Sequence, residues 1–320
     1  MNPADFWQPW EVTADSFAEV VSFIEGVRDR WVEGKHMSFA WRGVVDASWA
    51  LDSSLYRRLA WTRGGTKYPD EKALFEAENE LMVNVHRWGL HWSDGRRLPW
   101  LMQMAMLQHY GAPTRLIDIT FNAWIGVWFA VEQKWENGVE KHHDKDGRLF
   151  AVAVNNLIIN ERADLRPWED SLKRPWPKPP PKMSDADHEQ KAWMTRVTAW
   201  RPPHIDGRIA AQNGGFLIGG VPHDNTPTGR RYWPKTTSVG SHWKLDEVRR
   251  ATSVAVRPHL LNPTAGAPPE NPMFTLRIKA SAKEQIRRRL ADLYGYEHRT
   301  IYPDFPGFAS FGTPNLKQWP

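Results

Sequence analysis

The chain contains no cysteine among its 320 residues. This absence excludes disulfides, cysteine zinc sites, iron–sulfur clusters and cysteine nucleophiles, so any metal would need histidine or carboxylate ligands. No apolar run approaches the roughly 18 residues that a membrane span needs, and residues 1–11 lack the layout of a signal peptide. We therefore expect a cytoplasmic protein with no membrane partner.

Several common enzyme motifs are also missing. The sequence has no Walker A loop, no Gly-x-Gly-x-x-Gly fingerprint, no Gly-x-Ser-x-Gly elbow and no His-Glu-x-x-His helix. The stretch 142–146 (HHDKD) has side chains that can bind metals, but no second cluster stands at ligand spacing. We interpret it as a solvated loop and expect no metal.

The composition is that of a folded protein with one unusual residue type. Charged residues make up 25% and hydrophobic residues 41% of the chain, and the net charge of +5 favours an anionic ligand. Nineteen residues are tryptophan. Indoles can stack on nucleobases or on a nicotinamide ring, but most bulky aromatic side chains fill cores.

Hydrophobic periodicity predicts both helices and strands. We expect helices over residues 13–31, with Thr13 as the N-cap, 69–89, 99–110, 122–134 and 282–294, and extended segments over 38–44, 114–120, 147–154, 214–219 and 274–279. Helices precede, interrupt and follow the strands without regular alternation, which predicts an α+β fold with a central mixed or antiparallel sheet partly covered by helices. We expect one elaborated domain over residues 1–320, with a core over about 15–310 and a proline-rich insertion or loop over about 166–187.

Two charged residues, Arg115 and Asp118, interrupt an otherwise apolar extended segment. Buried charges need partners. One interpretation is structural: a buried ion-pair network holds the sheet and helices in register through Arg42, Arg115, Asp118 and Arg208. His109, at the end of a predicted helix, would be stabilised there by the helix dipole without any catalytic role.

Four segments together resemble the FRG domain family, which is named for an aromatic-x-x-Arg-Gly signature. They are residues 39–43 (FAWRG), 49–57 (WALDSSLYR), 108–120 (QHYGAPTRLIDIT) and 208–216 (RIAAQNGGF). Residues 302–307 (YPDFPG) also resemble the end of that family's domains. The resemblance implies that the chain shares the FRG fold over most of its length.

The first segment is also similar to the arginine-first ADP-ribosyltransferases, in which an early strand carries aromatic-Arg-Gly and the arginine binds NAD. That resemblance implies an ADP-ribosyltransferase-like fold, with NAD as the substrate that plays the cofactor's part. It implies catalytic roles for Arg42, His109, Asp118 and Gln212, and NAD-binding roles for Trp41, Arg42, Gly43, Tyr110, Arg115, Thr120 and Arg208. Such transferases place a glutamate late in the sheet, where the matching segment here has Gln212, and Asp118 is the candidate replacement.

Two functions are open at this point. The first is an intracellular effector of the toxin or antiphage-defence kind, which uses NAD to modify a protein or nucleic acid and has a neutralising antitoxin-like partner. The alternative is a non-catalytic or nucleolytic nucleic-acid-binding module, supported by the indoles and by the arginine clusters at 57–58, 230–231 and 287–289. The first function predicts turnover of NAD. The alternative predicts nucleic-acid binding that weakens steeply with salt but survives loss of Arg42.

Overall fold

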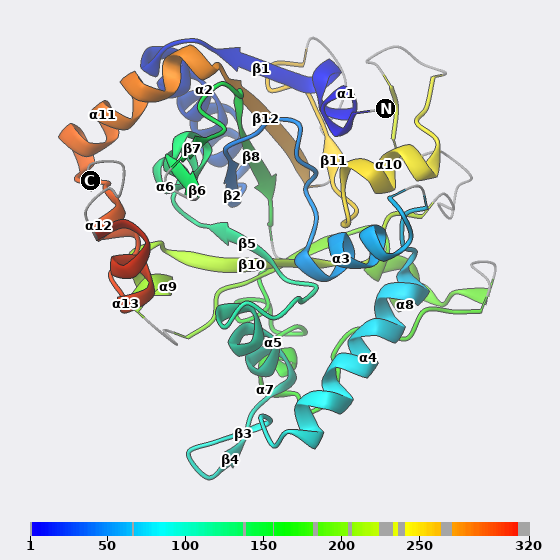
Figure 1. Cartoon of the computed structure of the whole chain (residues 1–320). Helices are drawn as coiled ribbons and strands as arrows, with labels where there is room; N and C mark the ends of the chain where they lie inside the picture. The colour runs from blue at the N-terminus through cyan, green and yellow to red at the C-terminus, as the bar shows by residue number, and fades with distance from the viewer. Residues whose placement is uncertain are drawn as a thin grey trace.

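A mixed β-sheet forms the centre of the computed structural model (Figure 1). The structure describes residues 2–65, 67–136, 139–155, 157–181, 185–203, 207–223, 233–235, 241–263 and 271–312. Within them, the strands of this sheet lie in the order β1 (Glu11–Ala14), β12 (Pro272–Ile278), β8 (Gly147–Ala153), β2 (Phe39–Val44), β5 (Ile117–Thr120), β10 (Gly214–Gly219) and β9 (Val197–Trp200), with β11 (Arg257–Pro258) also paired to β12. Strands β1 and β11 run parallel to β12, and the other pairs are antiparallel.

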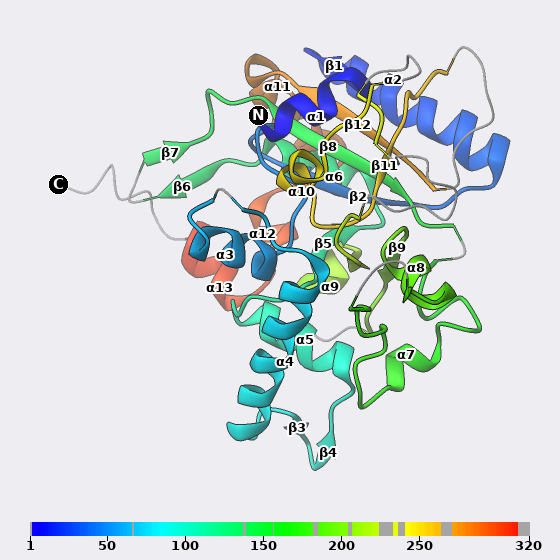
Figure 2. The same ribbon diagram turned by 90° about the vertical axis from the view of Figure 1, so that its right-hand side faces the viewer.

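Helices cover both faces of the sheet (Figures 1 and 2). One face carries α2 (Phe17–Val27), α6 (Ala123–Val131) and α11 (Lys283–Tyr294), and the other carries α1 (Pro3–Trp7) and α10 (Leu245–Ala251). The protein is therefore α+β with a mixed sheet covered by helices, as the sequence predicts.

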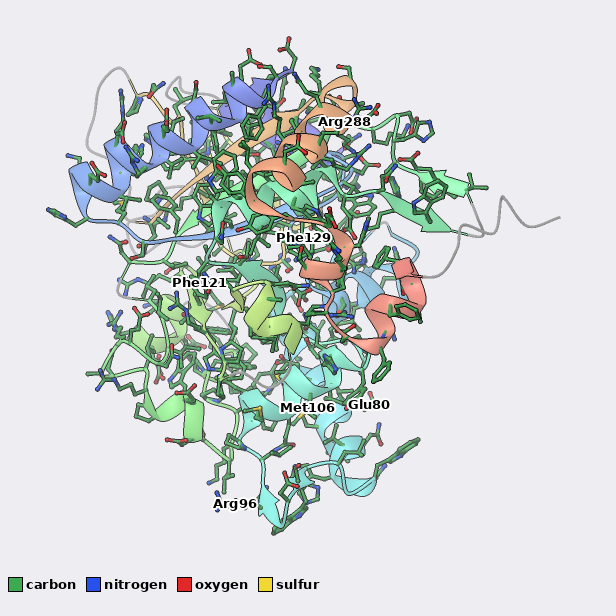
Figure 3. The ribbon with its side chains drawn as sticks, turned by 90° about the vertical axis from the view of Figure 1, so that its left-hand side faces the viewer. Glu80, Arg96, Met106, Phe121, Phe129 and Arg288 are labelled. Carbon is green, nitrogen blue, oxygen red and sulfur yellow. The ribbon has the colours of Figure 1, made fainter. Side chains whose placement is uncertain are left out.

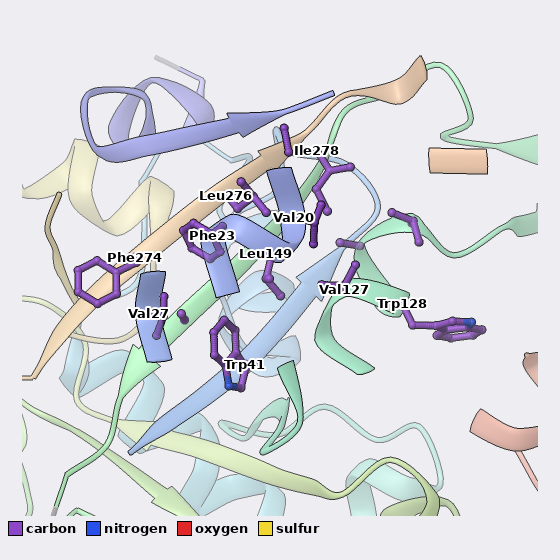
Figure 4. Packing of buried hydrophobic residues seen from close by; sticks show 14 of the residues in the cluster. Val20, Phe23, Val27, Trp41, Val127, Trp128, Leu149, Phe274, Leu276 and Ile278 are labelled. Carbon is purple, nitrogen blue, oxygen red and sulfur yellow. The ribbon is translucent and has the colours of Figure 1, made fainter. Parts of the chain in front are cut away.

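Strand β8 shows why the sheet needs cover on both faces. Its side chains alternate: Leu149 and Ala151 belong to the core under α2 and α6, whereas Phe150 and Val152 belong to the core under α1 and α10. All seven residues of the strand are buried. Figure 4 shows the first core, where α2 packs over β8 and β12 through Val20, Phe23, Val27, Leu149, Phe274, Leu276 and Ile278.

A second group of helices packs beside β10, in the lower part of Figure 1. It contains α3 (Ser54–Thr62), α4 (Glu71–Arg87), the hairpin β3 (Trp92–Ser93) and β4 (Arg96–Arg97), α5 (Trp100–His109), α7 (Pro167–Asp170) and α8 (His188–Trp193). The remaining elements are the hairpin β6 (Lys134–Glu136) and β7 (Val139–Lys141), the short helices α9 (Gly207–Ala211), α12 (His298–Ile301) and α13 (Phe305–Gly307), and the 3₁₀ or π turns Gln8–Trp10, Arg28–Glu33, Ala280–Ala282 and Phe308–Gly312.

Two glycines let α6 lie directly on the sheet. A Cβ atom on Gly43 of β2 would stand 2.0 Å from the carbonyl oxygen of Gly126, and one on Gly147 of β8 would stand 2.1 Å from that of Ala130. Only glycine fits at such distances. The signature glycine after Arg42 therefore serves helix packing, and it fixes where the C-terminal end of α6 lies.

Replacing Gly43 with alanine is expected to destabilise the protein by roughly 3 kcal/mol, because the new methyl group has to push a helix backbone away from the sheet. Urea denaturation followed by circular dichroism measures this. Gly207→Ala is the matched control, because the nearest atom to its new Cβ is 3.9 Å away. Equal denaturation midpoints for both variants would contradict the packing role.

The structure confirms the predicted helices and strands around β2, α4, α5, β5, α6, β8, β10, β12 and α11, and corrects two details. Thr13 is not an N-cap, because residues 11–14 form β1 at the sheet edge, and the cap of α2 is Ser16, whose hydroxyl accepts from the Glu19 amide. The proline-rich segment over about 166–187 is not only a loop: it contains α7 and buries Trp176.

Candidate active site

The sheet is nearly interrupted between β2 and β5. These two strands share one register pair, Trp41 with Thr120, and β5 and β10 run across the direction of β8 in Figure 1. A cavity of about 390 Å³ lies at this junction. We call it the junction cavity. Eight predicted site residues line it: Trp41, Arg42, Gly43, His109, Asp118, Thr120, Arg208 and Gln212.

Arg42 is the central cation of the junction cavity. Its Nη1 donates to the Asp118 carbonyl oxygen at 2.5 Å and lies 3.9 Å from Oδ2 of the same residue. Its buried Nε has no hydrogen-bond partner among the described residues, and 23% of the side chain is exposed. Burial lowers the pKa of this guanidinium, and the charge of Asp118 acts to raise it. Arg42 thus keeps donors for a ligand.

Asp118 is held beside Arg42 but remains open to solvent. Gln108 Nε2, at the end of α5, donates to its Oδ1 at 2.6 Å, while Oε1 of the same amide accepts from the Thr114 hydroxyl. Because a hydroxyl donor fixes Oε1 as the acceptor, the amide nitrogen must face Asp118. The carboxylate is 67% exposed, and the exposed His109 lies on the same wall.

Arg42 also lines a smaller hollow of about 140 Å³, together with Gln108 and Asp118. Arg57 of α3 also lines it and pairs there with Asp52 at 2.6 Å. Two guanidinium groups from different elements therefore share one small space.

The predicted residues of the late segment hold the wall of the junction cavity together. Arg208 of α9 makes a two-bond pair with Asp304, at 2.7 Å for each bond, and this pair lowers the pKa of Asp304. Gln212 Nε2 donates to the Ile301 carbonyl at 3.0 Å, and the backbone carbonyl oxygen of Gln212 accepts from Thr120 Oγ1 at 2.7 Å. These side chains therefore join α9, β5 and residues 301–304.

The structure adds a carboxylate that the motifs lack. Glu132 caps the C-terminal end of α6, lines the junction cavity and is only 4% exposed. Its Oε1 accepts from the Tyr302 hydroxyl at 3.0 Å, and its Oε2 lies 2.5 Å from Lys134 Nζ. Burial raises its pKa, while Lys134 acts to lower it. Sequence reasoning missed Glu132 because it stands outside the four matched segments.

Two predicted NAD ligands lie elsewhere. Arg115 is buried away from the junction cavity, where Glu71 and Glu78 bind its guanidinium at 2.7–3.1 Å and the Gly219 carbonyl accepts another of its bonds. Its prediction as a phosphate ligand is wrong, and so is its pairing with Asp118. Tyr110 is exposed and does not line the junction cavity.

The structure gives Gly43 a different role from the NAD-binding one predicted for it. It lines the junction cavity, but the space where its side chain would lie is filled by α6, so its small size serves the helix. Trp41 is similar, because its indole is buried in the core beside Phe39 and forms only part of the wall.

The basic clusters are partly engaged within the chain. Arg287 Nη1 donates to the Val131 carbonyl at 2.7 Å, and Arg288 pairs with Glu284. Residues 230–232 lie outside the described part of the chain. Among the described residues there is no group of three metal-binding side chains, and none of the helices there is both long and apolar enough to span a bilayer.

These features define an α+β protein with an arginine-bearing polar cavity where its sheet opens. Residues 37–138 match the family model of the FRG domain. The match supports the resemblance to that family over these residues, which include three of the four signature segments. The match covers Arg42, Asp118 and Glu132, whereas Arg208 and Tyr302 lie outside it. No curated protein matches the chain, and no solved structure matches it.

Proposed function

We propose that this protein is an ADP-ribosyltransferase-like enzyme that binds NAD in the junction cavity and transfers ADP-ribose to a macromolecule. One observation carries the proposal: Arg42, with an unpaired Nε among the described residues, shares a cavity with the buried carboxylate of Glu132. The volume of about 390 Å³ lies within the usual range of small-molecule sites.

The first task of such an enzyme is to grip a pyrophosphate. A guanidinium binds phosphate oxygens through two parallel bonds, and a partly desolvated one does so more strongly than a surface lysine. Arg42 meets both conditions, and Arg57 lies across the adjoining hollow. The rings of Phe129 and Phe216 offer apolar surface for the nicotinamide or the adenine; Figure 3 labels Phe129.

The second task is to break the bond between ribose C1′ and the nicotinamide nitrogen. Nicotinamide leaves with the bonding electron pair, and positive charge develops on the ribose. A buried carboxylate stabilises that charge, which is the role we assign to Glu132. An acceptor oxygen or nitrogen then bonds to C1′ and gives up its proton, for which the exposed Asp118 and His109 are the available bases.

Glu132→Gln is expected to slow nicotinamide release at least a hundredfold while changing NAD affinity less than threefold. The reason is that the positive charge on the ribose, which the Glu132 carboxylate stabilises, exists only in the transition state. Nicotinamide is measured by chromatography after incubating protein, NAD and either a cell lysate or nucleic acid. Glu140→Gln, at a carboxylate outside the junction cavity, is the control. Equal release by the Glu132→Gln variant and the wild type would remove the catalytic assignment.

The same carboxylate sets an expected pH dependence. Burial raises the pKa of Glu132 above its ordinary value of 4.5. The reaction needs the ionised form, so release should fall as the pH falls through this raised pKa, with a midpoint on the neutral side of 4.5. The residual activity of the Glu132→Gln variant should not show this fall in rate at low pH.

A further inference from the structure

The end of α4 and the hairpin that follows it form an exposed projection. We call residues 86–97 the aromatic tip. Figures 1 and 2 show the hairpin β3–β4 at the lower extremity of the molecule, and Figure 3 labels Arg96 there. Two indoles lie open to solvent in this segment, Trp88 at 80% and Trp92 at 54% exposure. Large exposed aromatic side chains in a short segment mark an interaction surface.

The backbone of the aromatic tip is well defined by its hydrogen bonds and turns. Helix α4 ends at Arg87, Gly89 follows it with a φ of 72°, and the Leu90 amide donates to the Val85 carbonyl at 3.0 Å. Asp94 and Gly95 both have positive φ, 49° and 72°, the pattern of a two-residue type I′ hairpin. The indoles are therefore presented on a framework that needs little ordering when it binds.

Side-chain stacking adds to this framework. The ring centroids of His86 and His91 lie 4.1 Å apart with 7° between the ring planes, so the last turn of α4 stacks on the residue that precedes β3. The ring centroids of His91 and Trp92 lie 5.9 Å apart, in a T-shaped arrangement. Trp92 stands opposite Arg97 in the hairpin register.

The charge of the aromatic tip is strongly one-sided. It contains Arg87, Arg96 and Arg97, all exposed, and one carboxylate, Asp94. Within the described part of the chain none of these three guanidinium groups forms a salt bridge. Unpaired guanidinium groups beside open indoles suit a ligand with regularly spaced negative charges and flat rings.

A lipid surface fits this arrangement less well. A membrane-inserting hairpin presents its apolar residues at the apex, whereas here the apex is Ser93, Asp94 and Gly95. The rings lie behind the apex, beside the arginines. A nucleic-acid strand, with bases that stack and a phosphate backbone, fits this arrangement of rings and arginines behind a polar apex better than acyl chains do.

We propose that the aromatic tip binds single-stranded nucleic acid by stacking bases on Trp88 and Trp92 and by contacting phosphates with its arginines. The inference rests on the proposed function in one respect: it names the macromolecule that is modified. Helix α5 runs from the hairpin to the junction cavity, with His109 at its far end, a span of about 15 Å for its ten residues. A strand held at the tip can therefore reach the cavity within a few nucleotides.

Fluorescence anisotropy of a labelled single-stranded oligonucleotide of about ten nucleotides, as DNA and as RNA, tests the proposal. Trp88→Ala and Trp92→Ala should each weaken binding roughly tenfold, the usual loss for one stacked base. The double variant Arg96→Gln/Arg97→Gln should reduce the magnitude of the slope of log affinity against log salt by about 1.4, because each phosphate contact to a single strand contributes about 0.7. The matched controls, Trp61→Ala on α3 and Lys72→Gln on the exposed face of α4, should bind as the wild type does.

The outcomes distinguish the two proposals. Tip variants should bind NAD normally, and Arg42→Ala should bind the oligonucleotide normally. If the oligonucleotide does not bind, or binds the tip variants and the wild type alike, the tip proposal fails while NAD binding is unaffected. Binding to phosphatidylglycerol vesicles in place of the oligonucleotide overturns it as well. If the oligonucleotide binds but NAD does not, the tip proposal stands and the enzymatic one fails.

Discussion

Replacing Arg42 with alanine is expected to weaken NAD binding at least a hundredfold and to reduce nicotinamide release to background. The expectation follows from its position: a partly desolvated cation whose Nε is unpaired within the described residues and whose loss leaves a bound pyrophosphate without its main counter-charge. Truncating one partner of such a charge pair costs about 2–5 kcal/mol or more. Isothermal titration with NAD, together with the nicotinamide assay, measures both effects.

Arg42→Lys separates charge from geometry. A lysine keeps the positive charge but loses the planar fork, so its activity should fall at least tenfold and remain above that of the alanine variant. Circular dichroism of both variants controls for folding, because Arg42 also donates to the Asp118 carbonyl. Undiminished turnover in a folded Arg42→Ala protein would show that the site is misassigned.

Replacing Arg115 with alanine is expected to give the largest loss of stability. The change leaves the buried carboxylate of Glu71 without its cation and that of Glu78 with Arg174 alone, 3.7 Å away. It also opens a space beside the stacked indoles of Trp176 and Trp193. Breaking a buried ion pair by removing one partner costs about 3–5 kcal/mol. Since folded proteins are stable by only about 5–15 kcal/mol, thermal denaturation should start at a much lower temperature.

A compensated variant keeps this prediction testable if the single one does not fold. Arg115→Met with Glu71→Gln and Glu78→Gln removes the charges of all three residues at once, leaving only that of Arg174, and should recover much of the lost stability. Its NAD affinity should match that of the wild type, because Arg115 lies outside the junction cavity. Normal stability combined with lost NAD affinity would instead restore Arg115 as a phosphate ligand.

The contrast between Arg42 and Arg115 shows what the sequence can predict. Both arginines stand in apolar, extended segments near a glycine or a proline, so local pattern does not separate them. What separates them is α4, whose buried stripe includes Glu71 and Glu78 beside Leu74 and Met82. Two glutamates on the apolar face of one helix require a buried cation, and that signal was available in the sequence.

Other parts of the site depend on tertiary contacts that no local pattern records. Glu132 lies in the cavity because Gly43 and Gly147 let α6 approach the sheet, and the closeness of those backbones follows from packing. In the same way, β1 forms because residues 11–14 pair with β12, which lies more than 250 residues later in the chain. The longer periodic helices and most buried strands, by contrast, were predicted with small errors at their ends. The buried strand β9 and the shorter helices α3 and α10 were not predicted.

The tryptophans also fall into two groups, one buried in the fold and one exposed on the surface. Trp176 and Trp193 are buried against Arg115 and anchor the proline-rich segment and α8 to α4, which is the ordinary structural use of an indole. Trp88 and Trp92 are exposed beside unpaired arginines of the tip. We did not predict the hairpin at 92–97, although Asp-Gly at 94–95 is typical of such a turn, and the exposure of the neighbouring side chains is known only from the structure.

A crystal structure of the protein bound to NAD tests the central claim most directly. Our account predicts that the pyrophosphate lies in the junction cavity within hydrogen-bond distance of the Arg42 guanidinium, with the nicotinamide ribose facing Glu132. Density for NAD at another place, or a cavity that stays empty at saturating NAD while Arg42 keeps its present contacts, would contradict it.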